Sequence, residues 1–110
     1  MEIKQVIDFT QTHLKNEKTG HDFYHGERVA NLASQMYLAD HADAHEDSRV
    51  VAIIKTAGYL HDTIDEKICA DPQKVIDEIK VLLPQVGFNE LEAWDILFTI
   101  QHMSFSANIE

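Results

Sequence analysis

The segment that most constrains the fold is an apolar run from Val50 to Leu60, which ends directly in His61 and Asp62. A run of this length suits a buried helix of about three turns and is shorter than the roughly 18 residues that a membrane span needs. The neutral nitrogen of a histidine and a carboxylate oxygen can both bind one divalent cation. Because a buried charge is costly without compensation, the pair indicates a functional site.

Length and charge limit the alternatives. The 110 residues fit one domain with a single core of packed helices. A net charge of -10, from 19 acidic and 9 basic residues, argues against a nucleic-acid polymer as the partner. The single cysteine, Cys69, excludes an internal disulfide and fits a reducing compartment. With neither a membrane-length apolar run nor a signal-peptide pattern, we expect a cytoplasmic protein without a membrane partner.

Helical spacing of apolar residues recurs along the whole chain, so the fold is expected to be all-α. Asp22, the Asp71-Pro72 pair and the imperfect capping box from Asn89 to Glu92 predict helix starts. The expected helices cover residues 2–16, 22–40 and 47–62, with a fourth from residue 71 and a fifth from residue 89. The fifth is apolar on more than one side, which is typical of a central or interface helix.

Two expected helix faces carry histidines. The second helix is expected to carry His25, Val29, Leu32 and Met36 on one apolar face, and the third to carry Val50, Ile54, Ala57 and His61 on its inner face. A short loop around residues 41–46 makes the two helices antiparallel neighbours. At a rise of 1.5 Å per residue, both histidines lie about 21 to 23 Å from the connection. They should therefore meet at the same level, beside Asp62.

Other polar residues fall near this group. Asp65 follows Asp62 by three, where it could handle a proton, or it could belong to an ordinary solvated turn. His21 precedes His25 by four and could support a ligand or only the helix start. Arg28, three residues after His25, could hold a phosphate oxygen or be a surface charge, and Lys67 could also offset phosphate charge.

The residues around these positions resemble the HD superfamily of metal-dependent phosphohydrolases. The resemblance rests on Gly20 to Val29 and on Leu60 to Lys67, and it extends over about residues 18–106, including Ile100 to Ser106. It implies that residues 1–110 form the N-terminal portion of a single HD domain, a bundle of about five helices. It further implies that His25, His61 and Asp62 bind a divalent cation. Asp65 matches an acidic position that assists catalysis in nucleotide-cleaving branches, where glutamate is more usual.

One departure from the family pattern is expected to matter. Family members usually complete the site with an aspartate from a helix further along than Glu110, so the chain is expected to lack its C-terminal half. Asp95 has suitable chemistry but does not match that segment. His102 is a better local candidate, with a simple polar residue on the last helix as the alternative. Three ligands should hold the metal weakly, with water in the open positions.

These expectations define a leading function and two alternatives. The leading function is hydrolysis of a phosphomonoester or phosphoanhydride of a small nucleotide by a metal-activated water, with Asp65 assisting and one divalent ion (Mn, Fe, Co, Ni, Zn or Mg). The first alternative is a noncatalytic metal- or nucleotide-binding module that forms a homodimer through its fifth helix. The second is a plain helical bundle with incidental histidines.

Overall fold

The computed structural model describes residues 1–15, 22–65 and 69–106, which fold into five α-helices and one short 3-10 helix. Within this portion no strand is present, so the all-α prediction is confirmed. The elements are α1 (Lys4–Leu14), α2 (Phe23–Asp40), α3 (Arg49–Leu60), η1 (His61–Ile64), α4 (Pro72–Val86) and α5 (Glu90–Ser106). None of the described helices combines the length and apolar character needed to cross a bilayer.

Local side-chain chemistry fixes where the helices start. The Asp22 carboxylate accepts from the His25 amide at 2.9 Å, and Asp71 caps α4 in the same way. At α5, the Glu92 amide donates to Asn89 while the Glu92 carboxylate accepts from the Asn89 amide. These caps satisfy amides that the first turn leaves without helical partners. All three predicted helix starts are therefore confirmed.

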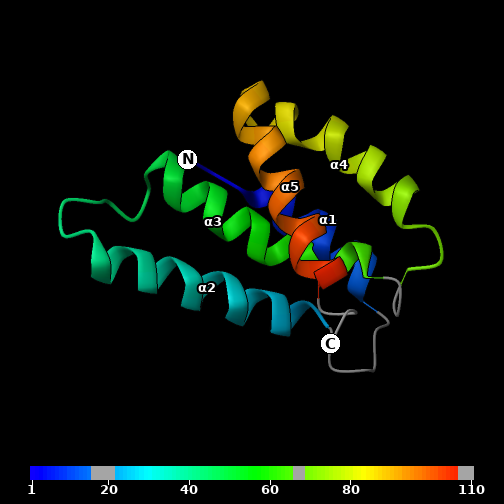
Figure 1. Ribbon diagram of the computed structural model, residues 1–110, viewed down its shortest axis with the longest axis horizontal. Helices are drawn as coiled ribbons and strands as arrows, with labels where there is room; N and C mark the ends of the chain where they lie inside the picture. The colour runs from blue at the N-terminus through cyan, green and yellow to red at the C-terminus, as the bar shows by residue number, and fades with distance from the viewer. Residues whose placement is uncertain (16–21, 66–68, 107–110) are drawn as a thin grey trace.

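Helix α3 lies at the centre of the molecule and packs against α1, α2 and α5 (Figure 1). Helices α2 and α3 run antiparallel and side by side, as the short loop between them predicts. Side chains from every helix except α2 fill the fully buried part of the core with large apolar groups: Val6, Leu14, Val51, Leu60, Ile64, Ile79, Leu83, Ile96 and Ile100. Since η1 follows α3 directly, its residues are anchored on this core.

The predicted apolar face of α2 is not the side of the helix that is buried. The buried side of α2 consists of the small residues Gly26, Ala30 and Ser34, whereas Leu32 and Met36 are each 61% exposed. Small residues occupy the contact between α2 and α3 because they let the two helix backbones approach closely. Dispersion contacts are then made along the whole interface. The large apolar side chains remain on the flank of the helix.

The predicted course of α3 needs two corrections. Val50, expected inward, is 45% exposed in the first turn, while Ala57 is buried as expected. The α-helix ends at Leu60 and tightens into η1, so Asp62 does not continue the α-helical path. In this tighter turn, the Thr63 hydroxyl donates to the Leu60 carbonyl at 2.7 Å, which satisfies one of the carbonyls that a helix end leaves without a partner.

An ion pair joins the starts of α3 and α5. Arg49 donates from Nε to Glu92 at 2.8 Å and from Nη2 to the Gly87 carbonyl at 2.9 Å. The hydrogen bond from Arg49, followed by that from the Asn89 backbone, lowers the pKa of Glu92 to about 2. The ion pair therefore connects the start of α5 to the start of α3, and α5 also packs against η1.

Candidate metal site

His25, His61 and Asp62 form a compact group of potential metal ligands. One ligand atom from each lies within 4.8 Å of the others. The Asp62 carboxylate is 3.6 Å from His25 Nε2 and 3.1 Å from His61 Nε2, and the two imidazole ring centroids are 5.7 Å apart. The level placement of the two histidines, predicted from helix lengths, is confirmed.

His25 is held in place at the start of α2. Its backbone amide donates to the capping Asp22, which fixes the first helical turn. Next to it, Phe23 stacks on Tyr59 of α3 with ring centroids 5.8 Å apart. Burial and then the charge of Glu27 raise the pKa of Tyr59, so this phenol stays neutral in the interface. These contacts fix the end of α2 that carries His25 against α3.

The orientation of His61 follows from a backbone contact. His61 Nδ1 lies 2.6 Å from the Gly58 carbonyl, and because a carbonyl only accepts, Nδ1 carries the proton. In a neutral ring, Nε2 then presents its lone pair toward the Asp62 carboxylate. Two acceptors at 3.1 Å repel each other unless a proton or a cation lies between them. This is the usual arrangement by which a backbone carbonyl orients a metal-binding histidine.

The group fits a divalent cation. Ligands bonded at about 2.1 Å lie about 3.0 to 3.4 Å from one another in octahedral or tetrahedral sites. The separation of 3.1 Å between His61 Nε2 and Asp62 Oδ1 falls within this range, and that of 3.6 Å between His25 Nε2 and Asp62 Oδ2 is slightly longer. The Asp62 side chain is only 4% exposed, so a cation would offset the cost of its buried charge. The exposed fraction of His25, 37%, leaves one side of the group open to solvent.

Among the described residues, the other candidates near α2 and α3 do not join the group of three ligands. Asp65 is buried at the end of η1, three residues from Asp62, and does not belong to the group of three ligands. Arg28 is exposed on α2, one turn after His25. The predicted candidates His21 and Lys67 lie outside the described residues.

Neither candidate on α5 joins the ligand group. The ring of His102 is exposed and stacks on Phe98 at a centroid distance of 6.0 Å. Asp95 is exposed, and its backbone carbonyl accepts a hydrogen bond from Thr99. The described residues thus offer three ligands to one cation, with neither Asp95 nor His102 as a fourth.

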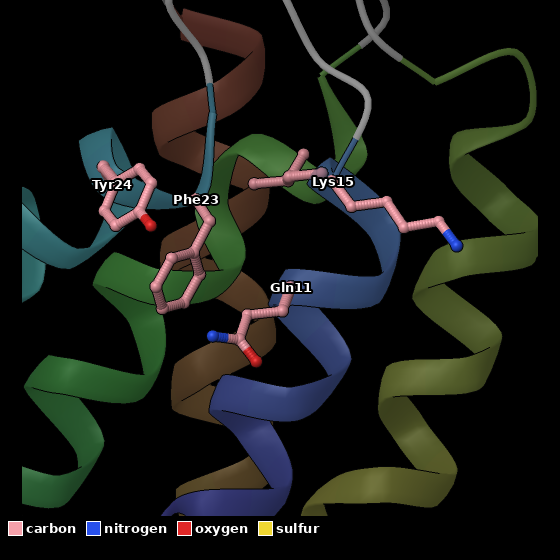
Figure 2. A pocket seen from close by; sticks show the side chains of 5 residues that line it. Gln11, Lys15, Phe23 and Tyr24 are labelled. Atoms are coloured by element: carbon pink, nitrogen blue, oxygen red, sulfur yellow. The ribbon is translucent and has the colours of Figure 1, made fainter.

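A hollow of about 300 Å³ lies between α1 and the start of α2 (Figure 2). Its lining residues Phe23 and Tyr24 directly precede His25 in the sequence. Gln11 and Leu14 of α1, Lys15 directly after α1, and the rings of Phe23 and Tyr24 line it. Figure 2 shows the Lys15 amine pointing away from the two rings. Because no metal ligand and no cation among the described residues points into the hollow, we do not assign it to a phosphorylated substrate.

Gly58 is a residue of the site that sequence reasoning missed. It provides the carbonyl that orients His61, and it meets Ala30 so closely that an added Cβ would lie 2.7 Å from the Ala30 Cα. Glycine within a helix is normally destabilising. Its presence in an otherwise apolar helix was the available signal for a close helix contact.

Comparisons with known proteins give one informative match. The chain is 30% identical over 102 residues to "Uncharacterized protein YpgQ" of Bacillus subtilis (strain 168). The match covers 93% of the chain but only 46% of the relative, so the chain spans about half the length of the curated relative it matches. No family model matches the chain. No solved structure matches it.

Proposed function

We propose that the protein binds one divalent cation and hydrolyses a phosphomonoester or phosphoanhydride of a small nucleotide. The observation that carries the proposal is the donor set of His25, His61 and Asp62, with separations suited to one cation. The resemblance of the surrounding segments to the HD phosphohydrolases supports the reaction class. Mixed nitrogen and oxygen ligands favour Mn, Fe, Co, Ni or Zn, and Mg remains compatible through the carboxylate.

A cation held here supplies Lewis-acid polarisation of a phosphoryl oxygen and lowers the pKa of water. The chain's own residues have the other roles. His61, oriented by Gly58, and buried Asp62 present the donors in a fixed geometry. Asp65 is proposed to orient and deprotonate the attacking water, since a buried carboxylate three residues from Asp62 suits a general base. Arg28 is proposed to hold a phosphate oxygen at the exposed side of the site.

The test is phosphate release from a panel of nucleotides with each metal ion, using the wild-type protein and three variants. His61→Ala and Asp62→Asn should abolish release while circular dichroism shows retained helix. Asp65→Asn should lower kcat by about 100-fold or more while leaving the metal affinity unchanged. His41→Ala is the matched control, because His41 is exposed and stacks on Tyr37 away from the ligand group.

Two outcomes would contradict the proposal. Unchanged release in both His61→Ala and Asp62→Asn would exclude this group as the active site. Metal binding without release from any phosphorylated compound would instead favour the noncatalytic binding module.

A nucleotide hydrolase with a single reduced cysteine fits the cytoplasm, and this location belongs to the same proposal.

A further inference from the structure

An apolar surface flanks the metal group on α2 and α3. We call it the apolar face: Val29, Leu32 and Met36 of α2, with Val50 and Ile54 of α3. Leu32 and Met36 are 61% exposed and Val50 is 45% exposed, while the other two are partly exposed. Adjacent exposed apolar side chains of this size commonly mark a surface that another polypeptide covers.

The two rows of the apolar face are contiguous. On α2, Val29, Leu32 and Met36 lie on the side of the helix that carries His25. On α3, Val50 and Ile54 lie on the side that leads to His61. The rings of His25 and His61 contact each other, and the two helices lie side by side and antiparallel (Figure 1). The rows therefore run next to each other from the metal group toward the α2–α3 loop, as a stripe that suits one packed helix.

The apolar face ends at the α2–α3 loop, and the charge of this loop indicates which kind of polypeptide can bind there. Exposed acidic side chains surround the α2–α3 loop: Asp40, Asp43, Glu46 and Asp47. The chain as a whole carries a net charge of -10. A second copy packed in the parallel direction would place like charges against one another, which is unfavourable across an interface. A helix with an apolar stripe and lysine or arginine at the end that meets this loop would be complementary.

The comparison indicates a source for such a helix. The relative contains a counterpart of 93% of this chain, and more than half of its own length lies outside the match. We propose that the apolar face docks an amphipathic helix from a polypeptide corresponding to that unmatched part of the relative. This inference rests on packing, on charge and on the extent of the match, so it stands or falls independently of the proposed hydrolysis.

The test compares two proteins. One is this chain alone, and the other, the fused protein, is the Bacillus subtilis relative with its matched segment replaced by this chain. No metal or substrate is added. Amide hydrogen exchange across residues 29–36 should slow by about tenfold or more in the fused protein, because docking suppresses local opening of α2. Leu32→Glu should lower the Tm of the fused protein by at least about 5 °C and change that of the chain alone by no more than about 2 °C.

Val81→Glu is the matched control, since Val81 is 62% exposed on α4, away from the apolar face. It should leave both Tm values nearly unchanged. Equal exchange of residues 29–36 in the two proteins would overturn the proposal, as would an equal effect of Leu32→Glu and Val81→Glu on the fused protein. A dimer of the chain alone that Leu32→Glu dissociates would also overturn it, in favour of a second copy.

Discussion

Replacing Gly58 by alanine should destabilise the fold and weaken the metal site together. The new Cβ would lie 2.7 Å from the Ala30 Cα and 2.9 Å from the Ala30 nitrogen, both backbone atoms that cannot rotate away. Reaching ordinary contact at 3.4 Å requires α2 and α3 to separate by about 0.7 Å. Overpacking of this kind costs about 1 to 3 kcal/mol, and the better helix propensity of alanine offsets about 1 kcal/mol.

The net loss in free energy of unfolding for Gly58→Ala is therefore up to about 2 kcal/mol, or up to about 10 °C in Tm. Gly26→Ala provides the matched comparison, because its added Cβ comes no closer than 3.4 Å, to the Tyr59 carbonyl oxygen. That variant should be unchanged or more stable by up to about 1 kcal/mol. Urea unfolding followed by circular dichroism measures both. A Gly58→Ala protein as stable as the Gly26→Ala protein would refute the close helix contact, because both variants gain the same helix propensity.

Two further predictions concern stability. Because the pKa of Glu92 is lowered from 4.5 to about 2, its ion pair with Arg49 stabilises the fold above pH 4.5 and loses this effect as the pH falls toward 2. The Tm difference between wild type and Glu92→Gln should accordingly be constant above that range and shrink within it; a difference independent of pH would contradict the pairing. Thr56 Oγ1 is buried and meets no hydrogen-bond partner within the described part of the chain, so Thr56→Val should raise the free energy of unfolding by about 1 kcal/mol. A loss of stability in urea titration would show that this hydroxyl is satisfied in solution.

Local chemistry explains which features the sequence could predict. A cap depends on a side chain and an amide three residues apart, so the starts at Asp22, Asp71 and Asn89 follow from the sequence. The meeting of His25 and His61 was also predictable, because helix length and a short loop determine it. These features need no knowledge of how distant segments pack.

Features that depend on packing between helices were missed. Helical spacing placed Leu32 and Met36 on the apolar face of α2, but the close approach of Gly58 to Ala30 buries the small residues instead. The pairing of Arg49 with Glu92 joins positions 43 residues apart, and no periodic pattern encodes it. The change from α3 to η1 at His61 likewise follows no periodic pattern in the sequence, and it accompanies full burial of Ile64 in the core.

The central claim is that His25, His61 and Asp62 bind one divalent cation, and a cobalt titration tests it most directly. The visible absorption of bound Co²⁺ reports the ligand set, and titration calorimetry reports the number of ions bound. We predict one equivalent per chain in the wild-type protein, and an affinity at least about tenfold lower in His61→Ala and Asp62→Asn with helix content retained. Absence of binding to the wild type, or equal affinity in the variants and in His41→Ala, would contradict the assignment.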